Sequence, residues 1–193
     1  MKPVHFYVTH PQVRIDPAVP VPRWSLSDVG RQRAELAAGF AWAASIRRIV
    51  SSDEAKAVET AQIFADRLRL TVEIRGGMHE NDRSATGFLP PPEFEATADQ
   101  FFAHPDQSIR GWERAADAQQ RIVAAVETAL AEQPEVPAAF IGHGGVGTLL
   151  YCRLAGLEIS RRHDQGPGGG GNYFAFERDP PKVLHAWRRI DAA

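Results

Sequence analysis

The hydrophobic positions of the chain fall into short apolar runs separated by stretches with a helical repeat. Residues 4–8, 46–52, 71–74 and 138–143 are runs rich in β-branched and aromatic side chains, which is typical of buried strands. Residues 29–44, 53–70, 112–133 and 146–156 instead repeat apolar side chains every three or four positions, which predicts amphipathic helices. Ser27 stands where the N-cap of the first helix is expected.

Strand and helix alternate through most of the chain. Such an alternation favours parallel strands, because each helix returns the chain to the same edge of the sheet and covers one of its faces. After the glycine-rich stretch "QGPGGGGN", residues 172–190 add two more candidate strands. We therefore expect an α/β fold, a three-layer α/β/α sandwich with a mostly parallel sheet, formed by residues 1–193 as a single domain.

Residues 75–110 do not follow this alternation. They contain several glycines, three consecutive prolines and little periodicity, so we expect an irregular insertion with one short helix over residues 94–102. Long excursions within compact domains are usually functional. We therefore expect this insertion to contribute to substrate specificity.

Composition and charge exclude several classes of function. The chain is 44% hydrophobic and 24% charged with a net charge of −2, so nucleic acid is not an expected partner. It contains no signal-peptide pattern at its start and no apolar run of about 18 residues, which argues against export and membrane insertion. Cys152 is the single cysteine, so we expect a small buried residue, no internal disulfide and a cytoplasmic location.

Two histidines directly follow predicted strands. His10 comes after residues 4–8, and His143 comes after residues 138–142. Ligands of open α/β sheets bind beyond the carboxyl ends of the strands, so we expect both imidazoles to face one crevice. Taken alone, a histidine at a strand end is more often structural, and the pair is what favours a site.

Further motifs accompany the two histidines. They are the helix start "SSDEAKAVETAQ" at residues 51–62, the acidic residue in "MHEND" and the late segment "FIGHGGV". Together these segments resemble the histidine phosphatase superfamily, which has a phosphoglycerate mutase-like fold. The resemblance implies that His10 attacks phosphorus and becomes a phosphohistidine. It also implies that Glu80 protonates the leaving oxygen and that His143 binds the phosphoryl oxygens.

The chemistry of these side chains agrees with those implied roles. A neutral imidazole is a nucleophile near pH 7 without deprotonation, whereas an alkoxide leaving group needs a proton. Asp82 is near enough in the sequence to compete with Glu80 for the role of acid.

Two positions depart from the family pattern. The family's Arg-His-Gly motif is Thr9-His10-Pro11 here, and its arginine on the serine-containing helix is Lys56. Lysine keeps the charge without the bidentate guanidinium, and threonine has no charge. An uncompensated loss of this kind costs about 3–4 kcal/mol of transition-state stabilisation.

A compensating positive charge is therefore expected. The candidates for phosphate binding are Arg14 and Arg23, in the proline-rich loop after His10, and Arg83 near Glu80. Thr9 and Lys56 stay candidate phosphate ligands as well. The alternatives are that Thr9 only ends its strand and that Lys56 lies on a solvated helix face.

Other segments have simpler interpretations. Ser51 and Ser52 are expected to cap the second helix. The stretch "GPGGGGN" is not followed by Lys-Ser or Lys-Thr, so it predicts a flexible turn whose last residue, Asn172, lies near the site. The remaining histidines lack the spacing of metal ligands, so neither a metal nor another cofactor is expected.

The function that these observations favour is phosphomonoester hydrolysis through a phosphohistidine. The expected partner is a phosphorylated small molecule or a phosphoprotein. The alternative is a phospholigand-binding protein of the same fold whose altered phosphate site has weak or no catalytic activity.

Overall fold

The computed structural model describes residues 2–192, and over these residues the strands form one six-stranded sheet in the order β3-β2-β4-β1-β5-β6. The strands β3, β2, β4 and β1 are parallel, while β5 and β6 are antiparallel. A mixed sheet that is mostly parallel is therefore confirmed. The strand bounds are β1 His5–Thr9, β2 Arg48–Ser51, β3 Val72–Ile74, β4 Ala138–Gly142, β5 Asn172–Glu177 and β6 Lys182–Arg189.

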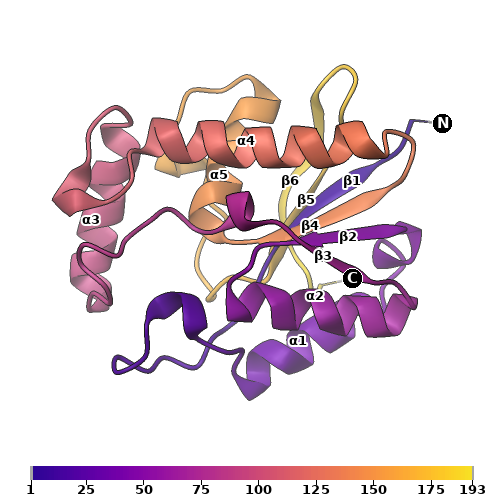
Figure 1. Cartoon of the computed structure of the whole chain (residues 1–193), viewed down its shortest axis with the longest axis horizontal. Coiled ribbons are helices and arrows are strands. Elements are labelled where there is room, and N and C mark those ends of the chain that lie inside the picture. Colours follow the sequence, from indigo (N-terminus) through magenta and orange to yellow (C-terminus); the bar gives the residue numbers. More distant parts are fainter. Residues whose placement is uncertain (1, 193) are drawn as a thin grey trace.

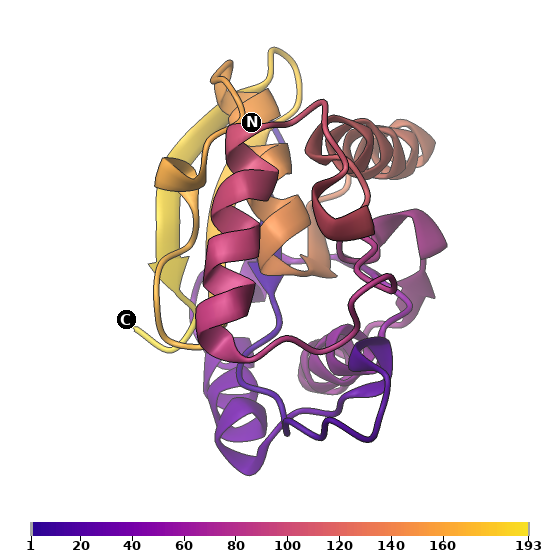
Figure 2. The same ribbon diagram turned by 90° about the vertical axis from the view of Figure 1, so that its left-hand side faces the viewer.

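Helices cover both faces of this sheet. Helices α1 (Asp28–Ala38) and α2 (Ala55–Leu68) pack on one face, and α4 (Ala115–Glu132) and α5 (Gly144–Ala155) pack on the other (Figure 1). Helix α3 (Pro91–Ala103) stands at one end of the molecule (Figure 2). The three-layer α/β/α arrangement is the fold expected from the sequence.

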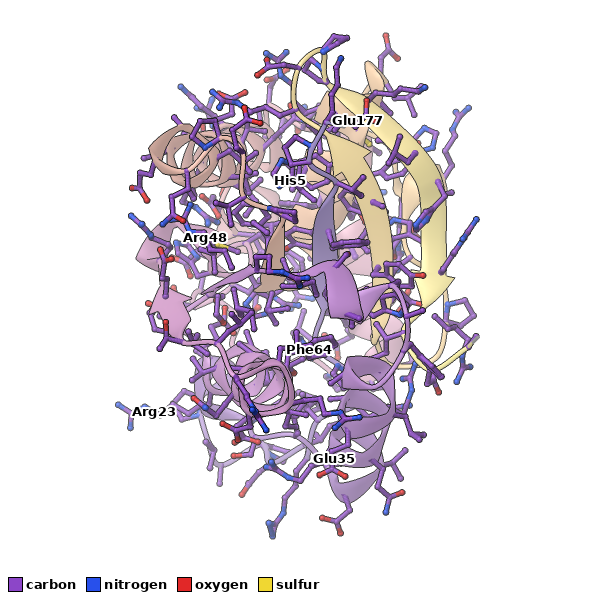
Figure 3. All side chains as sticks on the ribbon, turned by 90° about the vertical axis from the view of Figure 1, so that its right-hand side faces the viewer. His5, Arg23, Glu35, Arg48, Phe64 and Glu177 are labelled. Carbon is purple, nitrogen blue, oxygen red and sulfur yellow. The ribbon has the colours of Figure 1, made fainter. Side chains whose placement is uncertain are left out.

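The central strand β1 is buried on both faces. Tyr7 points into the core beneath α4 and α5, whereas Phe6 and Val8 point into the core beneath α1 and α2. A strand covered on both faces has no solvated side, so its sequence is a continuous apolar run rather than an alternating one. Figure 3 shows Phe64, which belongs to the core beneath α1 and α2, and Glu35 on the outer surface of α1.

Local signals account for the helix bounds. The Ser27 hydroxyl accepts the Gly30 N–H at 3.1 Å, which confirms Ser27 as the N-cap of α1. The helix ends at Ala38, short of the expected residue 44, because Gly39 caps it and residues 43–45 form a separate 3₁₀ turn. Helix α2 ends where Arg69 takes a left-handed conformation with φ of 59°.

The segment of residues 75–110 is more ordered than its sequence indicates. Its main element is α3, which has 13 residues where a short helix was expected. Prolines in the first turn begin this helix, since that turn needs no backbone donor. Phe101 and Phe102 then pack with Trp112 in the core, so these aromatic side chains stabilise the domain.

Within residues 2–192, no helix combines the length and the apolar composition needed to cross a lipid bilayer.

Candidate active site

The site lies beyond the carboxyl ends of two neighbouring parallel strands. Strands β1 and β4 pair in a register that places Thr9 opposite Gly142, so the next residues, His10 and His143, leave the sheet at the same level. The backbone N–H of His10 donates to the Gly142 carbonyl at 3.0 Å. The two imidazole centroids lie 5.2 Å apart in an edge-to-face arrangement.

Within residues 2–192, one ring nitrogen of His10 has a hydrogen-bond partner and the other has none. Its Nδ1 lies 2.9 Å from the Pro11 carbonyl oxygen, which can only accept, so Nδ1 carries the proton and Nε2 keeps its lone pair. Burial, assisted by the neighbouring His143 and by the Lys56 charge, lowers the pKa of His10 to about 3. The ring is therefore neutral at physiological pH, and Nε2 keeps an available lone pair.

His143 is fully buried and is oriented by Ser52. Its Nε2 lies 2.8 Å from the Ser52 hydroxyl, and burial lowers its pKa. The same hydroxyl accepts the Glu54 N–H at 3.3 Å, so its own proton is free to go to Nε2. In the tautomer in which Ser52 donates to Nε2, Nδ1 carries the ring proton, and within residues 2–192 this buried atom has no hydrogen-bond partner. In that tautomer His143 holds an unused donor.

The serines have a different role from the one expected. The N-cap position of α2 is Glu54, whose side chain makes no capping bond, so neither Ser51 nor Ser52 caps this helix. The capping prediction is wrong because the turn before α2 places Ser52 against His143. The sequence signal for this contact is the serine pair at the end of β2, the strand that neighbours β4.

Glu80 is held at the amino end of α5. Its carboxylate accepts three backbone N–H groups: those of Gly145 at 3.0 Å, Val146 at 2.9 Å and Asn81 at 3.0 Å. A methyl group at Gly145 would lie 2.7 Å from the carboxylate, so a glycine is needed for this approach. Burial opposes ionisation, but the Arg83 charge and these hydrogen bonds lower the pKa of Glu80. Before a ligand binds, Glu80 is therefore a carboxylate.

A buried ion pair lies next to His143. The Lys56 ammonium contacts the Glu54 carboxylate and donates to the Val21 carbonyl at 2.9 Å, and both side chains are buried. Glu54 also accepts the Glu80 N–H at 2.9 Å and lies 3.6 Å from His143 Nε2. Burial opposes ionisation of Glu54, yet His143 and Lys56 lower its pKa to about 2.

This pair changes the electrostatics expected at position 56. Lys56 was expected to offer its charge to phosphate, but the structure places a permanent negative charge against it. Sequence reasoning missed Glu54, because a glutamate at a helix start is normally solvated and no periodicity marks it as buried.

Thr9 is enclosed in a polar network. It is fully buried, its hydroxyl accepts the Asn172 N–H at 2.9 Å, and it donates to Gln165 Oε1 at 2.7 Å. The Asn172 carbonyl lies farther from the hydroxyl, at 3.3 Å, so the shorter contact directs the hydroxyl proton to Gln165. Asn172, at the end of the glycine loop, donates from Nδ2 to the same oxygen at 3.1 Å.

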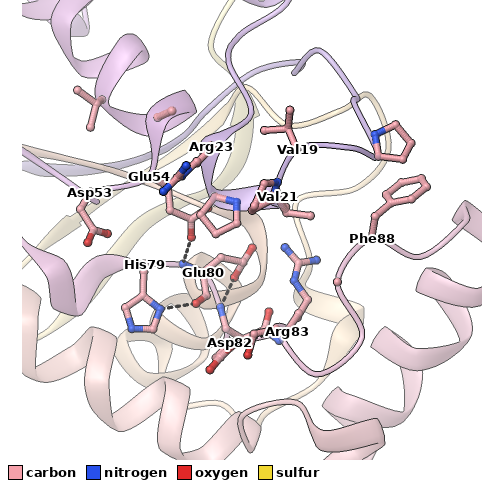
Figure 4. Close-up of a pocket in the computed structure, with 18 of the residues that line it drawn as sticks. Val19, Val21, Arg23, Asp53, Glu54, His79, Glu80, Asp82, Arg83 and Phe88 are labelled. Carbon is pink, nitrogen blue, oxygen red and sulfur yellow. Dashed lines mark hydrogen bonds between the residues drawn. The ribbon is translucent and has the colours of Figure 1, made fainter.

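A cavity of about 1020 Å³ adjoins the site (Figure 4). Its walls are the loop of residues 17–23, the start of α2, residues 79–84 and Phe88. Glu54, Glu80 and Asp82 are among the lining residues, whereas His10 and His143 are not. The cavity therefore borders Glu54 and Glu80, which lie beside the histidine pair, and neither histidine forms part of its wall.

The three candidate arginines differ in position. Arg23 and Arg83 line the cavity, and within residues 2–192 neither forms an ion pair, while Arg14 is exposed and lies outside the lining. The Arg83 guanidinium lies 5.1 Å from the Phe94 ring centroid and 5.6 Å from that of Trp112. These cation–π contacts hold Arg83 without neutralising it.

Comparisons with known proteins agree with this fold. A mycobacterial glucosyl-3-phosphoglycerate phosphatase, solved with inorganic phosphate, matches with a TM-score of 0.81 at 20% identity, over 99% of this chain and 100% of its own. The Bacillus stearothermophilus protein YhfR matches with a TM-score of 0.77 at 18% identity, over 98% of both chains. A phosphoserine phosphatase from Entamoeba histolytica, solved with 3-phosphoglyceric acid, matches with a TM-score of 0.74 at 17% identity, over 98% of this chain and 99% of its own.

No curated protein sequence is similar to the chain. The family model of the histidine phosphatase superfamily (branch 1) matches residues 19–184, a span that starts after His10 and contains Glu80 and His143. This match covers most of the sequence. The chain therefore belongs to the histidine phosphatase superfamily.

Proposed function

We propose that the protein hydrolyses phosphomonoesters through a phosphohistidine at His10. The observation that carries this proposal is the neutral His10 ring with a free Nε2, facing His143 with an unused Nδ1–H. Nε2 attacks phosphorus, the bond from phosphorus to the ester oxygen breaks, and the alcohol leaves. Water then attacks the phosphohistidine, which releases inorganic phosphate and restores His10.

The surrounding groups stabilise the charges that develop in this reaction. The Pro11 carbonyl accepts from Nδ1 of His10, so it stabilises the positive charge that the ring gains when Nε2 binds phosphorus. The Nδ1–H of His143 donates to an equatorial phosphoryl oxygen. Arg23 and Arg83 supply positive charge at the cavity, which Thr9 cannot supply and Lys56 shares with Glu54. Phosphoryl transfer depends mainly on such positioning and charge.

Glu80 is the group placed to give the leaving oxygen its proton. It is ionised before substrate binds, so it serves as an acid only in the complex, where the negative phosphoryl group raises the pKa of the neighbouring carboxyl. The phosphate monoester has its own second pKa of about 6, so it can bring the proton that Glu80 then donates.

The cavity favours a phosphorylated small molecule over a phosphoprotein. Pockets for drug-sized ligands have volumes of about 300–1,000 Å³. The present cavity of about 1020 Å³ accepts such a leaving group beside Glu80, with apolar side chains from Val19, Val21 and Phe88 on its wall.

Two observations favour a second candidate function, phospholigand binding with weak turnover. The buried Glu54 offsets the Lys56 charge, and the lowered pKa of Glu80 opposes its action as an acid. Both features reduce the rate without preventing binding of an anion at the histidine pair.

Hydrolysis of an aryl phosphate by the native chain and by His10→Ala tests the proposal. We expect native activity, a phosphorylated protein in rapid-quench samples, and loss of both in His10→Ala. His104→Ala is the matched control, because His104 is exposed at the end of α3 and should leave the rate unchanged. Activity that survives in His10→Ala rejects the mechanism. Phosphate binding without activity in the native chain favours the second candidate.

A further inference from the structure

The side-chain amide of Gln165 has a fixed orientation. Its Oε1 accepts from the Thr9 hydroxyl at 2.7 Å and from Asn172 Nδ2 at 3.1 Å. Because an amide oxygen only accepts and an amide nitrogen only donates, these two bonds fix which end of the amide points where. The backbone N–H of Gln165 donates to Asp164, whose carboxylate also accepts from Thr148 on α5. The side chain is therefore anchored at both ends.

The amide nitrogen of Gln165 lies against the start of α5. A methyl group at Gly144 would lie 2.2 Å from Nε2, so the nitrogen touches the residue that follows His143. The other end of the amide binds Thr9, which precedes His10. The Gly171 N–H donates to the His10 carbonyl at 2.9 Å and holds the glycine loop beside it. Gln165 thus lies between the segment that contains His10 and the segment that contains His143.

The donor capacity of this nitrogen is not used by the protein. Within residues 2–192, Gln165 Nε2 makes no hydrogen bond, although two partners hold the oxygen of the same amide. A fixed donor without an acceptor, next to a histidine pair with a second unused donor on His143, is a preorganised arrangement for an anion.

We propose that Gln165 is a phosphoryl-binding residue, whose Nε2 donates to an oxygen of the phosphoryl group held between His10 and His143. This inference rests on the proposed phosphate site. The inference explains why threonine replaces the family's arginine in the Thr9-His10-Pro11 motif. The short threonine side chain leaves room for the Gln165 amide, and its hydroxyl positions that amide. Gln165 binds as a neutral donor, so recognition at this point depends on hydrogen bonding rather than on charge.

Titration of orthovanadate into Gln165→Met measures this contact, because methionine keeps the length and loses both donors. A hydrogen bond to a charged group predicts about 10- to 100-fold weaker vanadate binding in Gln165→Met. Gln165→Glu should bind more weakly still, since its carboxylate repels the anion. Thr9→Val should cause a smaller loss, because it only releases one of the two bonds that orient the amide.

Gln107→Met, at an exposed position before the 3₁₀ turn at residues 109–111, is the matched control and should bind vanadate as the native chain does. Thermal unfolding of each variant confirms that the fold is kept. Native-like vanadate affinity in a folded Gln165→Met overturns the Gln165 assignment alone, if His10→Ala still abolishes turnover. A native chain that binds neither vanadate nor phosphate overturns both this inference and the proposed function.

Discussion

Replacing Glu54 by glutamine removes the buried negative charge that lies beside both Lys56 and His143. The pKa of Glu54 is about 2, so this charge is present at every pH at which the protein would be assayed. The glutamine oxygen can still accept the Glu80 N–H, which lies 2.9 Å from the native carboxylate. The substitution therefore changes the charge of the site with little change of shape.

The expected effect follows from distance. Glu54 Oε1 lies 3.6 Å from His143 Nε2, and the phosphoryl group would bind beyond the far ring nitrogen. The ring width of about 2 Å and a hydrogen bond of about 3 Å place the anion roughly 8–9 Å from Glu54. At an effective dielectric constant of about 20, two unit charges at this distance repel each other by about 2 kcal/mol.

Glu54→Gln should therefore bind orthovanadate more tightly. A gain of that size corresponds to about 10- to 30-fold in the dissociation constant. The same variant should be less stable, because Lys56 loses its buried ionic partner, and breaking such a pair costs about 3–5 kcal/mol. Tighter anion binding together with a lower free energy of unfolding distinguishes an electrostatic effect from general damage to the fold, which would weaken both.

Isothermal titration with vanadate at pH 7, with urea unfolding of the same samples, measures both quantities. Asp53→Asn is the matched control, because Asp53 lines the same cavity but is exposed and screened by solvent, so its affinity change should stay below about threefold. Unchanged or weaker vanadate binding by a folded Glu54→Gln would refute the view that Glu54 limits the positive charge of the site.

Two further predictions concern stability. Burial, helped by the Arg178 charge, lowers the pKa of His5 from 6.5 to about 4, so the unfolded chain binds this proton first as pH falls. His5→Asn should therefore remove about 2 kcal/mol of the stability lost between pH 7 and pH 5, measured by urea unfolding at both pH values; an identical pH dependence contradicts this. Arg33→Met removes a buried guanidinium that pairs with the partly buried Asp191 and binds the glycine loop, so it should cost about 3–5 kcal/mol of unfolding free energy. Arg31→Met, on the same helix but at the surface, should cost less than about 1 kcal/mol, and equal losses would contradict the role of Arg33.

The paired histidines illustrate what local sequence predicts well. Each follows a short apolar run, and parallel strands place their carboxyl ends at one edge, so a common location for His10 and His143 follows from pattern and topology. The contact between their rings needed one further fact, that β1 and β4 are adjacent in register. That adjacency depends on how the whole sheet is ordered.

The surroundings of the histidines were less predictable. Glu54 is two residues from Lys56 in the sequence, yet only the turn before α2 buries both charges against each other. Gln165 is 156 residues from Thr9, and no spacing connects them. Arg14 is close to His10 in the sequence but exposed, whereas Arg83 is distant and lines the cavity.

The amino-acid sequence by itself determined the layered α/β fold, most element positions and the pair of histidines, because these depend on hydrophobic periodicity and on residues that end strands. Tertiary structure alone decided which charges balance one another in the site and which hydrogen-bond donors it offers. Burial and hydrogen bonding set the ionisation of Glu54 and Glu80, and contacts across the sheet orient Ser52 and Gln165. Such properties depend on distances in the folded chain, which the order of residues does not display.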